Sequence, residues 1–224
     1  MSRYSERTYM VNSLQTRLKV AQSLTAIALL AGLALSLQGC VGVVVGGAVV
    51  GSMAATDRRT LGAQTEDKEI ALKVNTRMHD TIGDIAHIDV TSYNRKVLLT
   101  GEVRDQQMKD TAERETRAVQ GVQGVMNELE ITEKSSLGSR SSDALITSKV
   151  EANLIGEKNL NSSAFKVVTE RGTVYLLGRV TENEGKIAAS LTSEISGVMK
   201  VVKMFEYISE DELKSMTAAE GARS

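Results

Sequence analysis

The chain has 224 residues, of which 42% are hydrophobic and 25% charged, a globular composition sufficient for one or two domains. One cysteine and two histidines exclude an intramolecular disulfide and a Cys/His zinc site, and the absence of proline excludes proline-rich tracts. The net charge of −1 disfavours a nucleic-acid binder that depends on a basic surface. We therefore expect a binding or structural protein, or an enzyme that uses only carboxylates and lysines.

Residues 1–39 have the features of a secretory signal peptide. Basic residues precede the apolar run 24–37, and a small residue stands before Cys40. The sequence LQGC at residues 37–40 resembles the bacterial lipobox, which implies cleavage before Cys40 and acylation of its thiol and amino group. Several acyl chains, at about 0.8 kcal/mol per buried CH₂, anchor a protein stably to a membrane. Met10 is an alternative start to Met1.

Residues 40–62 form a predicted lipidated tether rich in glycine and valine. Residues 41–55, joined to the apolar run of the signal, give more than 30 residues without a charge. An uncleaved signal anchor is therefore an alternative, because about 20 apolar residues span a bilayer. The glycine spacing of 41–55 is also typical of associating membrane helices, which leaves weak self-association as a second alternative. We expect Arg58 and Arg59, which follow, to be solvated or to meet lipid phosphates.

An internal repeat follows the tether. We place the two copies at 63–134 and 141–208, joined by a linker rich in serine and glycine at 135–142, with a tail at 209–224 that we expect to be a frayed helix or disordered. The matched positions are Asp67, Ile70, Val74, Met78, Val90, Val97, Leu99, Gly101 and Val103 in the first copy, and Asp143, Ile146, Val150, Leu154, Val167, Val174, Leu176, Gly178 and Val180 in the second.

Each copy predicts the order α-β-β-α-β, an α+β fold with a three-stranded mixed sheet and two helices packed on one face. Asp67 and Asp143 are predicted N-caps of the first helices. Residues 125–131 and 201–208 are the predicted last strands. The predicted core consists of Ile70, Val74, Val97, Leu99, Val103 and Val119, and of Ile146, Val150, Val174, Leu176, Val180 and Ile195.

The strand pattern V-x6-V-x-L-x-G-x-V, followed by G-V-x-x-V at residues 121–125, resembles the BON domain. With the lipobox, the tether and DRRTLGAQ at 57–64, the chain resembles the dual BON-domain outer-membrane lipoproteins of Gram-negative bacteria. The resemblance implies contact with anionic phospholipid, support of outer-membrane integrity and protein assembly, and no enzyme activity. Lys203 departs from the family pattern, which Asn127 follows, and we expect the strand register to be retained.

The charges predict which copy meets the membrane. The first copy has 14 acidic and 10 basic residues, whereas the second has eight of each, so an anionic surface repels the first more strongly. At 100° per residue, the outward face of the second copy's first helix presents an apolar patch beside a lysine, as in interfacial helices, where the first copy has Glu69. The expected lipid-binding residues are Leu145, Ser148, Lys149, Ala152 and Ile155. Packing of this patch on the first copy is the alternative.

No constellation predicts catalysis or a metal site. His79 and His87 lack further ligands nearby and are expected at the surface. Residues 121–124 have no lysine and precede a strand, which argues against a phosphate loop. We therefore expect no cofactor, small-molecule substrate or nucleic acid. Val41 lacks the acidic character of an inner-membrane retention signal, which indicates the periplasmic face of the outer membrane. The alternative function is a scaffold for envelope proteins such as the outer-membrane protein assembly machinery.

Overall fold

A computed structural model describes residues 57–221, with side chains to residue 218. The predictions for the signal peptide, for Cys40 and for most of the tether lie outside the described residues. The first copy consists of α3 (Leu61–Thr81), β1 (His87–Tyr93), β2 (Lys96–Val103), α4 (Gln106–Arg117), β3 (Gly124–Asn127) and β4 (Glu130–Ile131). The second consists of α5 (Leu137–Gly156), β5 (Phe165–Glu170), β6 (Thr173–Val180), α6 (Glu182–Ser193) and β7 (Lys200–Tyr207), followed by α7 (Glu210–Gly221).

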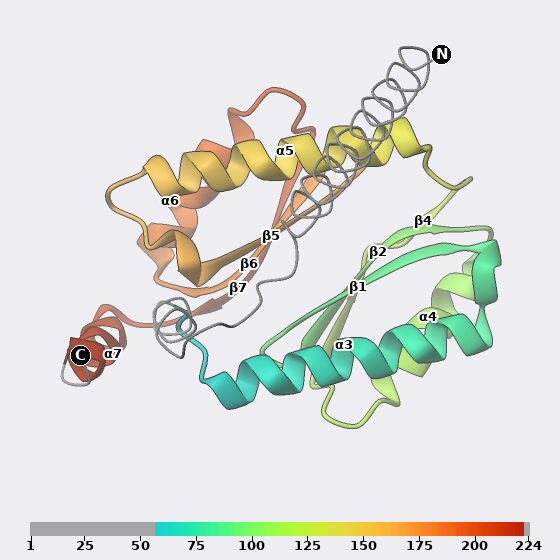
Figure 1. Cartoon of the computed structure of the whole chain (residues 1–224), viewed down its shortest axis with the longest axis horizontal. Helices are drawn as coiled ribbons and strands as arrows, with labels where there is room; N and C mark the ends of the chain where they lie inside the picture. The colour runs from blue at the N-terminus through green and yellow to red at the C-terminus, as the bar shows by residue number, and fades with distance from the viewer. Residues whose placement is uncertain (1–56, 222–224) are drawn as a thin grey trace, which may run out of the picture. The chain divides into compact units, whose positions relative to one another are not determined.

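Both copies have the predicted α+β architecture, with two helices on one face of a mixed sheet (Figure 1). The middle strand pairs antiparallel with the strand before it and parallel with the strand after the second helix: β1-β2-β3 in the first copy and β5-β6-β7 in the second. Tight turns close both hairpins, and Asn94, Arg95, Arg171 and Gly172 adopt the positive φ angles that such turns need.

The last strands differ between the copies. Leu99 pairs with Asn127 and Leu176 with Lys203, so the predicted register is confirmed. The first copy's strand is nevertheless interrupted between β3 and β4, where one continuous strand was expected. The Asn127 amide donates to the Lys109 carbonyl at 2.9 Å and its oxygen accepts from the Leu129 N–H at 3.3 Å. These bonds turn the chain out of the ladder, whereas Lys203 leaves β7 continuous.

A hydrophobic core lies between helices and sheet in each copy. The predicted core residues are buried, except that Ile195 is only partly buried. In the first copy, the core residues of α3 pack on the central strand β2: Ile70, Val74 and Met78. In the second copy, those of α5 pack on the central strand β6: Ile146, Val150 and Leu154. The i, i+4, i+8 periodicity therefore predicted the inward faces of both long helices correctly.

The helix-free faces of the two sheets share a third core. It contains Tyr93, Leu98, Tyr175 and Leu177, which are all buried, with partly buried residues of β3, β5 and β7 around them. β2 and β6 are therefore buried on both faces. Both copies accordingly belong to one compact unit.

The predicted N-caps Asp67 and Asp143 are wrong. The helices begin earlier, and their N-caps are Thr60 and Ser136, whose hydroxyls accept from backbone N–H groups. Both aspartates lie inside the helices and are buried. Their carboxylates instead accept from the backbone N–H groups of the hairpin turns: Asn94 at 2.7 Å and Arg95 at 2.8 Å in the first copy, Arg171 at 3.0 Å and Gly172 at 2.8 Å in the second.

The predicted linker differs from the structure, whereas the tail follows the helical one of its two predicted alternatives. α5 begins at Leu137, so most of the linker 135–142 is helical. The tail is not disordered over its described part, because it forms α7. Ser209 accepts from the Glu212 N–H at 3.1 Å, and the Glu212 carboxylate binds Arg179 at 2.9 Å. A cap and an ion pair thus hold a segment whose apolar pattern is weak.

Candidate functional site

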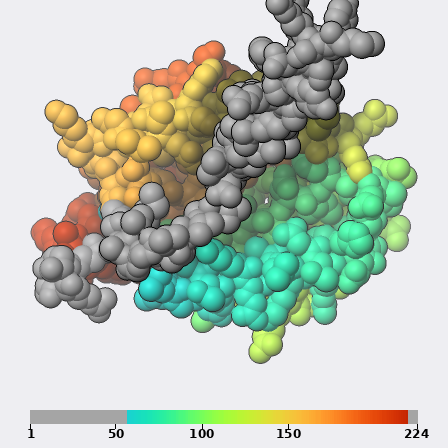
Figure 2. All heavy atoms as spheres, viewed as in Figure 1, coloured from blue at the N-terminus to red at the C-terminus, as the bar shows by residue number. Residues whose placement is uncertain are grey.

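The outward face of α5 brings the five predicted lipid-binding residues together. Their opposite neighbours Ile146, Val150 and Leu154 pack into the core, so this face of the helix is open to solvent. Leu145 is 63% exposed and Ile155 is 71% exposed. The residues between and beside them, Ser148, Lys149 and Ala152, are exposed as well. Atoms of this helix, in yellow, lie on the surface seen in Figure 2.

Leu137 extends this face toward the start of α5, and the sequence analysis missed it. Its side chain is exposed, and it precedes Ile155 by 18 residues, which is about five helical turns. Leu137 and Ile155 therefore lie on the same side of the helix. Recognising Ser136 as an N-cap, with its hydroxyl 3.1 Å from the Ser139 N–H, would have placed Leu137 in the helix.

The corresponding face of α3 is more polar. Glu69, which occupies the position of Leu145, forms an ion pair with Lys73 at 2.6 Å. Lys149, the counterpart of Lys73, has no ion-pair partner among the described residues. Leu61, the counterpart of Leu137, and Leu72 are also exposed on α3, so the first copy is not free of outward apolar side chains. The difference between the helices lies in the paired charges and in the number of large apolar groups.

Arg58 is neither solvated nor free for lipid phosphates, which corrects the first prediction for the end of the tether. Its guanidinium makes two bonds of 2.7 Å to the Glu184 carboxylate and one of 2.9 Å to the Arg179 carbonyl. Burial alone would raise the pKa of Glu184, but the bonds from Arg58 and from Thr181 lower it overall. The start of the described chain is thus attached to the second copy.

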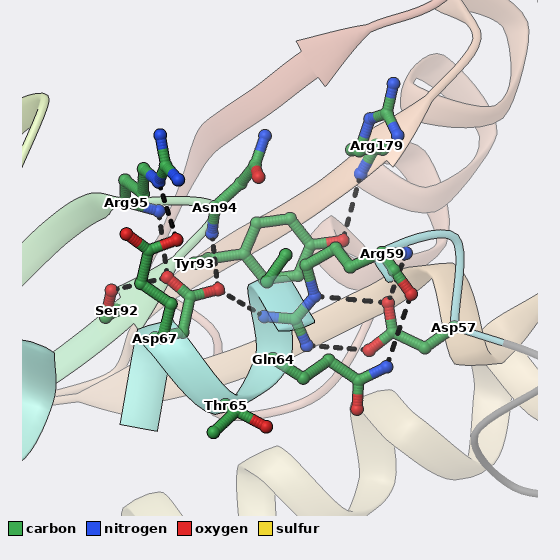
Figure 3. A network of polar contacts seen from close by, with 12 residues as sticks. Asp57, Arg59, Gln64, Thr65, Asp67, Ser92, Tyr93, Asn94, Arg95 and Arg179 are labelled. Carbon is green, nitrogen blue, oxygen red and sulfur yellow. Dashed lines mark hydrogen bonds and ion pairs between the residues drawn. The ribbon is translucent and has the colours of Figure 1, made fainter. Parts of the chain in front are cut away.

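Arg59 is equally engaged, but with the first copy (Figure 3). It binds Asp67 at 2.9 Å and Asp57 at 2.6 Å, and its guanidinium carbon lies 4.0 Å from the centre of the Tyr93 ring. The Tyr93 hydroxyl in turn accepts from the Arg179 N–H of the second copy at 3.2 Å, and burial raises the pKa of Tyr93 to about 12. The arginine pair therefore contacts both copies.

His87 is also not the surface histidine expected from the sequence. Its Nδ1 lies 3.0 Å from Oε2 of Glu102, and its side chain is 17% exposed. With Glu170 these residues form the only group of histidine, cysteine or acidic residues in the described chain that is placed to hold a metal ion. His79, in contrast, is an exposed residue beside Asp80, as expected.

Comparison with known proteins identifies the family. Residues 66–133 and 142–209 each match the BON domain. The chain is 38% identical over 187 residues to the outer membrane lipoprotein DolP of Haemophilus influenzae, a match that covers 83% of this chain and 97% of the relative. The chain belongs to the dual BON-domain lipoproteins of the outer membrane. We refer to its two copies as BON1 and BON2.

Two further relatives share the BON architecture more distantly. The 21 kDa hemolysin of Actinobacillus pleuropneumoniae is 30% identical over 68% of this chain and 79% of its own length. Osmotically-inducible protein Y of Escherichia coli K12 is 27% identical over 83% of this chain and 95% of its own length. These relatives are not named for an enzymatic reaction. Among the described residues of BON1 and BON2, no helix is long and apolar enough to cross a membrane.

Proposed function

We propose that this lipoprotein binds anionic phospholipid through the outward face of α5 in BON2 and so supports outer-membrane integrity. The observation that carries the proposal is the pair of exposed apolar side chains, Leu145 and Ile155, beside Lys149, which has no ion-pair partner in the part of the chain that the structure describes. Apolar groups that enter the acyl boundary next to a cation at headgroup level are typical of interfacial helices. Ser148 and Ala152 are small, so the helix can lie close to the bilayer surface.

The charges of the two domains support BON2 as the contacting domain. BON1 carries a net charge of −4 over residues 63–134, whereas BON2 is neutral over 141–208. Each charge near an anionic surface contributes about 1 kcal/mol, so BON1 is repelled where BON2 is not. Glu151 at the edge of the face opposes binding. Anchoring through Cys40 raises the effective concentration of BON2 at the membrane, and thus a modest intrinsic affinity suffices.

We expect Leu145→Glu to weaken binding to anionic vesicles roughly tenfold. Full burial of a leucine side chain contributes about 1.5–3 kcal/mol, and partial insertion contributes less, while the new carboxylate is repelled by the lipid. Stability should hardly change because the site is exposed. The measurement is flotation of the fragment 57–224 with anionic and with neutral vesicles.

The matched control is Glu69→Leu in BON1, the equivalent helix position. It should leave binding unchanged or strengthen it, because it removes a negative charge and adds an apolar group. Equal flotation of the native and Leu145→Glu fragments would contradict the α5 site.

We expect Cys40→Ala to abolish lipid anchoring. Without the thiol no diacylglyceryl group can be attached, so intact mass should show the loss of the acyl chains that the native chain carries, and signal peptidase cleavage before residue 40 should fail. The measurement is palmitate labelling together with membrane fractionation. A native chain that takes up no palmitate and keeps residues 1–39 would support the signal-anchor interpretation instead.

A second candidate function is a non-catalytic scaffold that contacts envelope proteins such as the outer-membrane protein assembly machinery. It is favoured by the edge strands, because β1 and β7 each pair with one strand only among the described residues. An open edge can add a strand of a partner. Failure of the native fragment to bind either type of vesicle, with capture of an assembly component from envelope extract, would favour this function over lipid binding.

A further inference from the structure

A buried polar cluster, none of whose residues lies on α5, brings side chains of BON1 and BON2 together. His87 of β1 and Glu102 of β2 belong to BON1, and Glu170 at the end of β5 belongs to BON2. One donor atom from each, an imidazole nitrogen or a carboxylate oxygen, lies within 4.8 Å of the other two. Glu170, 68 positions after Glu102 in sequence, thus joins a neighbouring pair of BON1 residues to present three possible ligand atoms to one point.

Two of these side chains have unsatisfied polar atoms. Glu102 is 0% exposed and Glu170 is 8% exposed. The Oε1 atom of each is buried without a hydrogen-bond partner. Within the described chain these are the only two buried side-chain nitrogen or oxygen atoms left in that condition. A buried carboxylate oxygen without a partner costs free energy, so the cluster is incomplete as the protein side chains alone form it.

The protein supplies too little positive charge to compensate. Arg171 is the nearest cation, but its Nη1 lies 3.8 Å from Glu102 Oε1, and its Nε is bonded to Glu130 at 2.9 Å. Burial, and next the charge of Glu102, raise the pKa of Glu170 to about 7. Among the described residues, the cationic groups placed near these two carboxylates are therefore His87, where its imidazole is protonated, and the more distant Arg171.

We propose that His87, Glu102 and Glu170 form a site for a divalent first-row transition metal, best matched by Zn²⁺, that links BON1 to BON2. One imidazole and two carboxylates are a donor set used for such ions, and three protein ligands leave a position for water. Tetrahedral metal–donor bonds of about 2.1 Å place donors about 3.4 Å apart, so the cluster, whose donor atoms lie within 4.8 Å of one another, needs to contract by at most about 1.4 Å. We expect rotation of the Glu170 side chain to supply that movement.

The surroundings of the imidazole fit this role. Metal-bound histidines commonly donate their second ring N–H to a carboxylate, which fixes the tautomer and the ring orientation. His87 Nε2 lies 3.4 Å from Asp89 Oδ2, while Nδ1 faces Glu102. The imidazole is partly exposed, which gives an ion access from solvent. A bound metal would tie the two sheets together beside their shared apolar core.

The test is a titration of the purified full-length chain in detergent with Zn²⁺ at pH 7.5. Binding is measured by calorimetry and by competition with a chromophoric chelator. We expect about one Zn²⁺ per chain and a rise in Tm on saturation. Glu170→Gln keeps the side-chain shape and should weaken binding at least tenfold. Asp89→Asn, at an exposed second partner, should weaken it by about 10–100-fold. His79→Ala removes the other histidine and should have no effect.

Circular dichroism of the metal-free variants separates loss of the site from loss of the fold. Glu170→Gln removes a like-charge contact, so the metal-free variant should be folded. Absence of saturable Zn²⁺ binding by the native chain would overturn the proposal, since the two carboxylates would then share a proton instead. Binding that is unchanged in both Glu170→Gln and Asp89→Asn would overturn it as well. Neither result depends on lipid binding by α5.

Discussion

Leu176→Ala is expected to lower the free energy of unfolding by about 2–5 kcal/mol. Leu176 is fully buried in the middle of β6, on the face that packs against α5 and α6. Truncation loses the transfer free energy of the side chain and leaves a cavity that the surrounding strands fill only in part. The measurement is urea unfolding of the fragment 57–224, followed by circular dichroism.

Two matched variants serve as controls for this measurement. Leu99→Ala makes the same truncation at the equivalent position of β2 in BON1 and should have a cost in the same range, because Leu99 is also fully buried. Leu145→Ala removes an exposed leucine and should change the free energy of unfolding by less than about 0.5 kcal/mol. An unchanged unfolding curve for Leu176→Ala would show that the assignment of the repeat to two equivalent cores is wrong.

Asp67→Ala is expected to lower the free energy of unfolding by about 3–5 kcal/mol, the range for a broken buried ion pair. The carboxylate is buried inside α3. It accepts hydrogen bonds from Ser92 Oγ at 2.7 Å, Asn94 N at 2.7 Å, Arg95 N at 2.8 Å and Arg59 Nη1 at 2.9 Å. Its removal leaves the turn amides and the largely buried Arg59 with fewer acceptors.

The repeat supplies the control for this variant. Asp143 holds the equivalent turn through the backbone N–H groups of Arg171 and Gly172, and no arginine side chain of the described residues is bonded to it. Asp143→Ala should therefore cost less, about 1–3 kcal/mol. Urea unfolding of both variants measures the difference. Equal costs would mean that the ion pair with Arg59 adds nothing to the stability of the fold.

The periodicity of apolar residues predicted the fold because each element has one dominant inward face. Ile146, Val150 and Leu154 recur every four residues, and this pattern orients α5 without knowledge of its neighbours. The same pattern places Leu145 and Ile155 outward, so the candidate lipid-binding face followed directly from the inward one. The role of Asp67 could not be predicted in this way, because an aspartate near a helix start is common as an N-cap. No residue close to Asp67 in the sequence indicates that it binds a turn 27 residues later.

The sequence of the two central strands does indicate that BON1 packs on BON2, although the sequence analysis treated these strands as alternating. Val97-Leu98-Leu99 and Val174-Tyr175-Leu176-Leu177 are continuous apolar runs, which are typical of strands buried on both faces. A sheet with helices on only one face needs a partner for the other. In contrast, the contact of Arg58 with Glu184 joins residues that no local pattern relates, so it required the tertiary structure. The same holds for the approach of Glu170 to His87 and Glu102, although His87 and Glu102 are themselves paired across the β1–β2 hairpin.

Insertion of α5 into the bilayer is tested most directly by a single environment-sensitive dye. The fragment 57–224 contains no cysteine, because the only one is Cys40. Leu145→Cys and Glu69→Cys therefore each give one labelling site, on equivalent helices of BON2 and BON1. On addition of anionic vesicles we expect a blue shift and an increase in dye emission at position 145, and no change at position 69. Equal responses at both positions, or a response at position 69 alone, would contradict membrane contact through α5.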